Sequence, residues 1–344
     1  MSRAAVLAGL GSALPDRVVT NEELTALTDS SDEWIRTRTG IRQRHFAVEG
    51  TATSDLAVAA GQCALKSSGQ GGADAVLVAT TTPDRPCPAT APLVASRLGL
   101  SGAAAFDVGA VCTGFIYALA AAAGLIAART ADRVLVIGAD TFSSILNPRD
   151  RTTFAVFGDG AGAALLRAGE PDEPGALNTF DLGSDGEGRD LITVRAGGSQ
   201  QRLAATVSDP DDQYFTMAGR EVFRHAVQRM ERSVRAALET AGWQHTDVDR
   251  LVCHQANQRI LDRLADLLGI DPRRVVSNIA LVGNTAAASI PLALHQAHGD
   301  GSLRAGHRVL LTAFGGGLTW GSVTLTWPRL AALDGSTSGP SPEN

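Results

Sequence analysis

Apolar residues along this chain occur in short continuous runs rather than in strict alternation with polar residues. Runs of about four to eight apolar residues are typical of strands that are buried on both faces of a sheet. We expect strands at Ala5–Gly9, Ala75–Ala79, Arg133–Gly138, Ala161–Leu166, Leu251–His254, Arg308–Ala313 and Ser322–Thr326. Between Glu221 and Thr240, apolar residues recur every three or four positions, which predicts an amphipathic helix. Strands that alternate with helices indicate the α/β class.

The two halves of the chain repeat one another. Segment Ala73–Val78 resembles Val248–Cys253, and Arg133–Val136 resembles Arg308–Leu311, both at an offset of 175 residues. Apolar strands look alike, so one match alone would carry little weight. Matches in the same order at one offset indicate a duplicated α/β unit.

A loop-like segment with two prolines marks the join between the repeats. We therefore assign residues 1–172 to an N-terminal half and residues 173–330 to a C-terminal half. Residues 183–213 are rich in Gly, Ser, Asp and Gln, and we expect them to form an irregular insertion. Residues 331–344 are poor in apolar side chains, which predicts a disordered tail.

Composition and charge exclude several classes of protein. Of the 344 residues, 44% are apolar and 19% charged, which excludes disorder along the whole chain. The net charge of -6 argues against a nucleic-acid partner. The four cysteines form no CxxC pair, so we expect no metal site and a cytoplasmic location. The longest apolar run, Gly114–Ala128, is too short to span a membrane.

Cys112 is the first candidate for chemistry. It precedes a helix of almost wholly apolar residues, which places the thiol at a helix N-terminus. The helix dipole and free N–H groups there favour a thiolate, so we expect its pKa to lie below the usual value of about 8.5. A helix that is apolar on every face would be central and dry, which suits a shielded nucleophile. A buried structural cysteine is the alternative, and the local sequence leaves both open.

Other candidates follow predicted strands or turns. His254 ends the strand that begins at Leu251, and strand ends of this kind bind ligands in open α/β sheets, although a structural histidine is the alternative. Asn284 is either a helix cap or part of a crowded site. The glycines after Phe314 could leave N–H groups free for an oxyanion hole, or could form a hairpin turn. The glycines after Phe157 lack the spacing of a dinucleotide loop, so NAD is not expected.

Together these segments resemble the β-ketoacyl-acyl-carrier-protein synthase III family of the thiolase superfamily, from about residue 5 to residue 327. The motifs are Ser31-Asp-Glu-Trp-Ile-Arg-Thr-Arg-Thr-Gly-Ile, Ala110-Val-Cys-Thr-Gly-Phe, Phe157-Gly-Asp-Gly-Ala-Gly-Ala, His254-Gln-Ala-Asn, Gly283-Asn-Thr-Ala-Ala-Ala-Ser and Phe314-Gly-Gly-Gly. The resemblance implies a thiolase-like αβαβα five-layer fold from two duplicated halves, a homodimer, and a catalytic triad of Cys112, His254 and Asn284.

The resemblance also implies a reaction. An acyl-CoA primer would acylate Cys112, and malonyl-acyl-carrier protein would then lose CO2 to give an enolate that attacks the thioester. His254 and Asn284 would donate hydrogen bonds to the oxygen where charge grows. The N–H groups of Cys112 and Gly316 would hold the acyl-cysteine oxygen. The product, β-ketoacyl-acyl-carrier protein, would start fatty-acid or polyketide chains, and no cofactor is expected.

Substrate contacts follow from the same resemblance. Trp34 and Arg151 would sandwich the adenine of CoA, and Arg38 would meet its phosphates. The pantetheine tunnel would be lined by Gly219, Phe223, Ala256 and Asn257. The acidic carrier protein would dock on Arg224, Arg259 and Arg263. The family often places a lysine pair where Asp266 and Leu267 stand here, which implies different docking or a dedicated carrier protein. An ordinary solvated face is the alternative for these arginines.

Cys87 stands where acetyl-preferring members often have phenylalanine. Its loop, Pro83–Pro88, would cross the dimer into the partner's pocket, so a small residue there would admit a longer or branched primer. Packing at the interface is the alternative role.

Other functions of the same fold leave different signatures. A thiolase would need a second cysteine beside Phe314, and elongating synthases carry histidine in place of Asn284. An acyltransferase that does not condense, or an inactive scaffold subunit, remain as alternatives. The scaffold subunit is disfavoured because it would lack Cys112.

Overall fold

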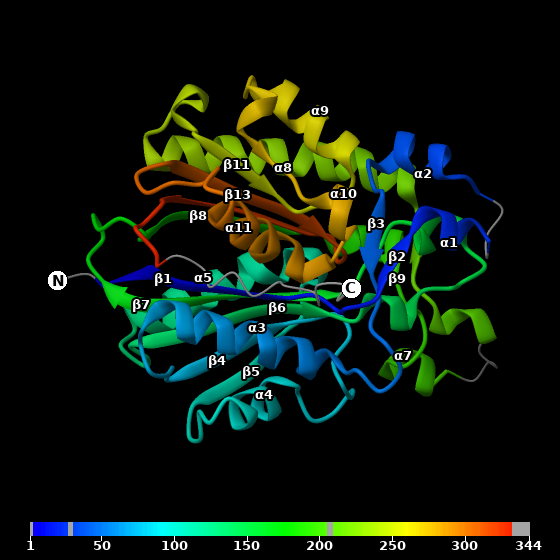
Figure 1. Cartoon of the computed structure of the whole chain (residues 1–344), viewed down its shortest axis with the longest axis horizontal. Helices are drawn as coiled ribbons and strands as arrows, with labels where there is room; N and C mark the ends of the chain where they lie inside the picture. Colours follow the sequence, from blue (N-terminus) through cyan, green and yellow to red (C-terminus); the bar gives the residue numbers. More distant parts are fainter. Residues whose placement is uncertain (1–2, 27–29, 205–208, 332–344) are drawn as a thin grey trace, which may run out of the picture.

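The computed structural model describes residues 3–26, 30–204 and 209–331. Two five-stranded sheets alternate with three layers of helices, so the order of layers is helix, sheet, helix, sheet, helix (Figure 1). This is the five-layer α/β architecture that the sequence analysis predicts. The predicted disordered tail, residues 331–344, lies outside the described residues except for Ala331.

The two sheets have the same topology. The first contains, in spatial order, β1 (Ala4–Ala13), β7 (Gly160–Gly169), β6 (Arg133–Asp140), β4 (Ala75–Ala79) and β5 (Ala104–Val108). The second contains β8 (Leu177–Ser184), β14 (Thr319–Thr326), β13 (Arg308–Gly315), β11 (Arg250–Cys253) and β12 (Val275–Val276). In each order the first two pairings are antiparallel and the last two parallel. The repeated sequence segments form the equivalent strands β4 and β11. The boundary at residues 172 and 173 stays a prediction.

All seven predicted strands are present, and most extend further than predicted. The chief misses are β5 and β8, which lie at sheet edges and alternate between covered and exposed side chains. An edge strand need not be a continuous apolar run, because one side of it faces solvent. Within the predicted irregular insertion the chain forms β9 (Ile192–Thr193) and, just beyond it, β10 (Thr216–Met217), which pair with each other.

Helices cover the sheets and fill the space between them (Figure 1). The outer face of the first sheet is covered by α3 (Thr53–Ser68) and α4 (Ala91–Arg97), and that of the second by α8 (Gly219–Ala241) and α9 (Gln258–Leu268). The middle layer consists of α5 (Gly114–Ala127) and α11 (Ser289–Gly299). The smaller helices are α1 (Asn21–Thr25), α2 (Asp32–Thr39), α6 (Arg151–Phe154), α7 (Ser199–Arg202) and α10 (Ile279–Val282).

Helix α5 is the centre of the hydrophobic core. Its side chains Phe115, Ile116 and Ile126 are almost wholly buried, and they pack in one cluster with residues of both sheets. A helix that is apolar on every face has no polar side to place in solvent, so it is stabilised by burial on every side. The expected central position of the helix after Cys112 is therefore confirmed. No helix of the described residues is both long enough and apolar enough to cross a membrane.

Candidate active site

Cys112 lies in a single 3-10 turn, Val111–Thr113, directly before α5. The backbone bends sharply there, since Val111 has a φ of 47°, which is rare for a β-branched residue. The Cys112 side chain is buried, and burial together with the negative charge of Asp140 raises its pKa. The expected lowering is therefore wrong for the resting enzyme, because desolvation of the thiolate outweighs the favourable helix N-terminus.

His254 follows β11 and is buried beside the first residue of α11. Its Nδ1 atom lies 2.7 Å from Oγ of Ser289, which is also buried. Burial lowers the pKa of His254 to about 3, so the ring is neutral near pH 7. A serine hydroxyl that donates to Nδ1 leaves the single ring proton on Nε2. Ser289 was not among the predicted site residues, although it ends the small-residue run that follows Asn284.

Asn284 is held by backbone hydrogen bonds on both sides. Its N–H donates to Val156 and its carbonyl accepts from Gly158, both at 2.9 Å. Its side-chain Oδ1 accepts from the N–H of Ala286 at 3.0 Å. Because the amide oxygen is engaged, the amide nitrogen is the end of the side chain that remains to donate to a ligand.

Cys112, His254 and Asn284 line one cavity, whose volume is about 40 Å³. The rest of its wall is mostly apolar: Val111, Phe157, Ile192, Phe215, Met217, Val222, Ala226, Met230, Ala256, Ile260, Phe314 and Gly315. An apolar wall excludes water and strengthens any hydrogen bond formed inside. The structure thus brings together the three predicted triad residues, from three distant parts of the sequence.

An aromatic cluster forms one side of this cavity. Phe142 and Phe157 stack with ring centroids 4.2 Å apart, and Phe215 meets both rings edge-on at 5.0 Å. Phe215 and Met217 lie just beyond residues 183–213, the segment that was expected to be irregular. These two apolar side chains, which follow a polar segment, were the available signal, and it was missed.

The glycine-rich turn after Phe314 lies against the Cys112 turn. A side chain at Gly315 would come within 2.9 Å of the Cys112 backbone nitrogen, and one at Gly316 would crowd Ile192 and Val111. The hydroxyl of Thr319, which follows this turn, donates to the carbonyl of Ala110 at 3.3 Å. Glycine is therefore required here for close approach. The oxyanion hole formed by Cys112 and Gly316 remains a prediction.

The predicted adenine-binding residues cluster at the surface. The guanidinium carbons of Arg38 and Arg151 lie 5.1 and 5.4 Å from the centre of the Trp34 ring. An aromatic ring between two stacked groups needs about 7 Å, twice a carbon contact distance of about 3.5 Å. For adenine to stack between Trp34 and Arg151 as predicted, Arg151 would therefore have to move away from the Trp34 ring.

Two of the predicted tunnel residues connect to the Trp34 cluster or to the cavity: Asn257 bonds to Arg38, and Ala256 lines the cavity. Asn257 caps α9 and donates from Nδ2 to the carbonyl of Arg38, which ties α9 to α2. Gly219 begins α8 and Phe223 lies one turn later, while Ala256 lines the cavity itself.

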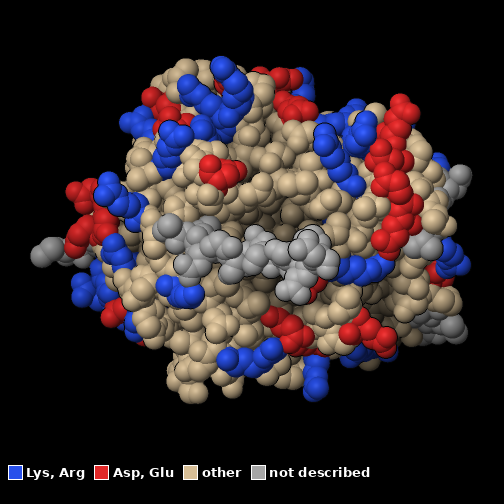
Figure 2. All heavy atoms as spheres, viewed as in Figure 1, with Lys and Arg blue, Asp and Glu red and all other residues tan. Residues whose placement is uncertain are grey.

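The predicted carrier-docking arginines are exposed. Arg224 lies on α8, and Arg259 and Arg263 are one turn apart on α9. Their guanidinium groups form no ion pair within the described part of the chain. Figure 2 shows a stripe of acidic side chains over α1 and the start of α2, which carry Glu22, Glu23, Asp32 and Glu33. An acidic partner would be repelled from that stripe and attracted to the arginines.

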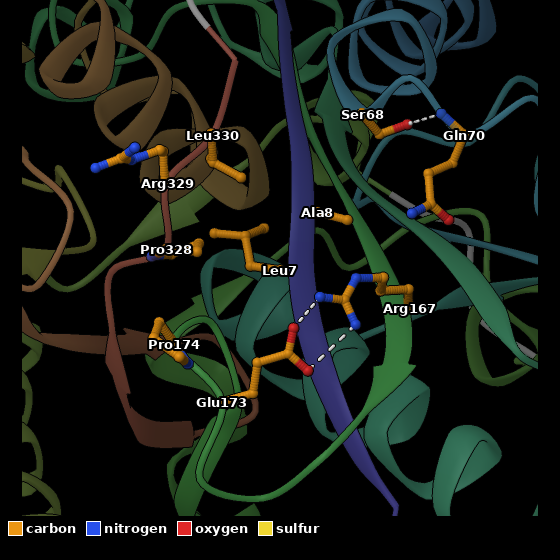
Figure 3. A pocket seen from close by; sticks show the side chains of 10 residues that line it. All are labelled: Leu7, Ala8, Ser68, Gln70, Arg167, Glu173, Pro174, Pro328, Arg329 and Leu330. Carbon is orange, nitrogen blue, oxygen red and sulfur yellow. Dashed lines mark hydrogen bonds and ion pairs between the residues drawn. The ribbon is translucent and has the colours of Figure 1, made fainter.

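Cys87 is exposed on the loop between β4 and α4 and does not line the cavity of its own chain. A separate hollow of about 350 Å³ lies beside β1 (Figure 3) and shares no lining residue with the cavity. Within it Glu173 pairs with Arg167, while Arg329 points away from that pair. In the described ranges, no three His, Cys, Asp or Glu side chains group as metal ligands.

Comparison with known proteins identifies the family. The model described as 3-oxoacyl-[acyl-carrier-protein (ACP)] synthase III matches residues 106–186, and its C-terminal counterpart matches residues 238–327. β-Ketoacyl-[acyl-carrier-protein] synthase III 3 of Streptomyces coelicolor is 64% identical and covers 96% of this chain and 99% of its own.

Comparison with solved structures indicates the same family. The 3-oxoacyl-(acyl carrier protein) synthase III of Pseudomonas aeruginosa PAO1 matches with a TM-score of 0.90 and 53% identity, covering 95% of this chain and 99% of its own. The priming β-ketosynthase of the R1128 polyketide biosynthetic pathway matches with a TM-score of 0.88 and 34% identity, covering 95% and 97%. This chain therefore belongs to the β-ketoacyl-[acyl-carrier-protein] synthase III family.

Proposed function

We propose that this protein condenses an acyl-CoA primer with malonyl-acyl-carrier protein, with loss of CO2, and that Cys112, His254 and Asn284 carry the reaction. Family membership makes the protein an acyltransferase that acts on acyl-CoA and acyl-carrier-protein thioesters. The observation that supports the assignment of roles is the cavity itself. It brings one thiol and two neutral polar side chains together within an apolar wall.

In the first half-reaction the Cys112 sulfur attacks the thioester carbonyl of the primer. The C–S bond to CoA breaks, and CoA leaves as a thiol that carries the proton released by Cys112. Neutral His254 would donate a hydrogen bond from Nε2–H to the Cys112 sulfur as its thiolate forms, because burial keeps the ring uncharged. The backbone N–H groups of Cys112 and Gly316 would stabilise the oxyanion of the tetrahedral intermediate.

In the second half-reaction malonyl-acyl-carrier protein loses its carboxylate as CO2. The electron pair of the broken C–C bond forms an enolate, which needs hydrogen-bond donors rather than a base or a cofactor. Nε2–H of His254 and Nδ2–H of Asn284 would be those donors. The enolate carbon then attacks the acyl-Cys112 carbonyl, and the cysteine leaves as thiolate and regains a proton.

Acyl transfer without condensation is the second candidate, and the product on the carrier protein separates the two. The enzyme would be incubated with an acyl-CoA and malonyl-acyl-carrier protein, and the carrier protein analysed by mass spectrometry. The proposed reaction predicts a β-ketoacyl product two carbons longer than the primer. A carrier protein that bears only the primer's acyl group would favour the alternative.

A homodimer is part of the proposal, because β5 is an unpaired edge of the first sheet. Its Phe106 is 39% exposed, and Leu93 on the neighbouring α4 is 47% exposed. An exposed apolar edge strand can pair with the same strand of a second copy. Sedimentation should give twice the monomer mass for the native chain and the monomer mass for Phe106→Glu. A monomeric native chain would reject this part of the proposal.

Primer choice would then depend on the loop that bears Cys87, since that side chain is exposed in its own chain. A small residue that enters the partner's pocket would leave room for branched or longer primers. Cys87→Phe should shift the preference toward acetyl-CoA. An unchanged chain-length preference would leave Cys87 with a packing role at the interface.

A further inference from the structure

Asp140 ends β6 and is fully buried behind the catalytic cavity. Its carboxylate accepts five hydrogen bonds: from the hydroxyl of Thr80, the N–H of Thr81, the N–H and hydroxyl of Thr82, and the N–H of Ala287. It also lies close enough to Cys112 for its charge to raise the pKa of that thiol. The reaction proposed above assigns no step to this carboxylate.

One carboxylate oxygen holds the turn that follows Asn284. The N–H of Ala286 donates to Oδ1 of Asn284 at 3.0 Å, and the next N–H, that of Ala287, donates to Oδ2 of Asp140 at 3.0 Å. Ala286 has a φ of 46°, a left-handed conformation that is costly for alanine. A strained residue keeps such a conformation only when its surroundings fix it, and here the N–H of Ala286 and that of the next residue, Ala287, are both held.

The same turn is clamped against β6. A side chain at Gly138 would come within 2.2 Å of the Ala287 carbonyl oxygen, so glycine is needed for the turn to approach the strand. The N–H of Ala287 thus binds the end of β6 while its carbonyl packs on the same strand.

The other carboxylate oxygen holds the turn at the end of β4. All four of its donors come from Thr80, Thr81 and Thr82, which lead into the loop that carries Cys87. Asp140 is therefore the side chain that joins the Asn284 turn to the base of this loop.

We infer that Asp140 is a positioning residue, which fixes the Asn284 turn through the N–H of Ala287 so that the Asn284 amide points at the enolate oxygen. The inference rests on the proposed function. Only a carboxylate can accept hydrogen bonds on both sides, because an asparagine would present its NH2 group to one set of N–H donors. Asp140 touches neither substrate, so its large effect should appear in the step that uses Asn284, beside a small effect on the ionisation of Cys112.

The test compares the two half-reactions in Asp140→Asn. Acylation is followed by intact mass after rapid mixing with acyl-CoA, and decarboxylation by CO2 release from malonyl-acyl-carrier protein. We expect decarboxylation to fall about 100-fold, as for a donor displaced by about 1 Å. Acylation should stay within about threefold, since removing the charge of Asp140 makes Cys112 easier to ionise.

A matched control is Asp107→Asn. Asp107 lies in the same sheet and accepts from the N–H groups of Thr90 and Ala91 at 2.8 and 2.7 Å, away from the Asn284 turn. The control variant thus also loses a carboxylate that accepts from backbone N–H groups, but at a residue that does not contact the catalytic residues. Both half-reactions should change equally, by no more than about twofold.

A second readout is the double variant Asp140→Asn with Asn284→Ala. If Asp140 acts through Asn284, the double variant should decarboxylate no more slowly than Asn284→Ala alone. Independent, multiplied losses would overturn the inference, as would an equal loss of both half-reactions in Asp140→Asn. If that variant does not fold, Asp140→Glu replaces it. Its extra methylene displaces Ala287 and predicts the same selective loss.

Failure of the proposed function would look different. A native enzyme that acylates Cys112 but releases no CO2 would reject the condensation itself. A native enzyme that condenses, beside an Asp140→Asn variant that condenses equally well, would reject only the role of Asp140.

Discussion

The Oγ atom of Ser289 lies 2.7 Å from Nδ1 of His254, and both side chains are buried. The contact engages Nδ1, and its direction sets which nitrogen of the neutral ring carries the proton. With Ser289 as donor, Nε2–H is the end of His254 that can meet a substrate oxygen. This contact connects the end of β11, before His254, to the start of α11 at Ser289, across the layer that contains the site.

Removing the serine hydroxyl should therefore impair condensation more than acylation. We expect Ser289→Ala to lower CO2 release about five- to tenfold, as one lost hydrogen bond of about 1 kcal/mol implies. Ser233→Ala is the control, because that serine is equally buried but lies on α8 with its hydroxyl toward a backbone carbonyl. An unchanged rate of CO2 release in Ser289→Ala would show that the tautomer does not depend on Ser289.

The two proposed enolate donors should be separable from the nucleophile. His254→Ala and Asn284→Ala should each lower the decarboxylation of malonyl-acyl-carrier protein about 100-fold, the usual effect of one lost donor. Asn284→Ala should still form the acyl-Cys112 adduct, since the amide has no part in that step. The measurement is CO2 release beside intact mass, and loss of the adduct in Asn284→Ala would contradict the assigned role.

Trp34 offers a test of CoA binding. Trp34→Ala should raise the KM for acyl-CoA about two- to tenfold with little change in kcat, because a stacking partner contributes about 0.5–1.5 kcal/mol. Trp243→Ala is a close control, since Arg308 lies over that ring at 5.4 Å, the same distance as Arg151 from Trp34. An equal rise in KM for both variants would place the adenine elsewhere.

The reactivity of Cys112 should depend on pH in a defined direction. Burial and the charge of Asp140 raise its pKa, so the thiolate is scarce at pH 7 and becomes more abundant as pH rises. Alkylation of Cys112 by iodoacetamide should still accelerate above about pH 10, where a model peptide thiol with a pKa of about 8.5 has levelled off. In Asp140→Asn the curve should move to lower pH. A plateau at or below about pH 10 in the native protein would contradict the raised pKa.

Much of the fold could be predicted from the sequence, because strands buried on both faces carry a strong apolar signal. The strands β4, β6 and β11 and the central helix α5 were all placed in this way. The edge strand β5 carries no such signal, since its outer side faces solvent. The local pattern of apolar residues does not show whether a strand has a neighbour on both sides or lies at the edge of its sheet.

The site was predicted less completely. The positions of Cys112, His254 and Asn284 follow from motifs, but the residues that hold them come from elsewhere in the chain. Asp140 meets the triad only through tertiary contacts, so no spacing rule indicates it. Ser289 lies within the Asn284 motif, but its contact with His254 is formed only in the fold. The pKa of Cys112 was predicted in the wrong direction for the same reason: a local helix N-terminus was visible, whereas burial and Asp140 were not.

The most direct test of the account is the covalent adduct on Cys112. The protein and its Cys112→Ala variant would be incubated with acetyl-, propionyl-, butyryl-, isobutyryl- and hexanoyl-CoA, and their intact masses measured. The account predicts a mass gain of one acyl group with one or a few of these primers, and none in Cys112→Ala. An equal gain in Cys112→Ala, or no gain with any primer delivered on CoA or on a carrier protein, would contradict it.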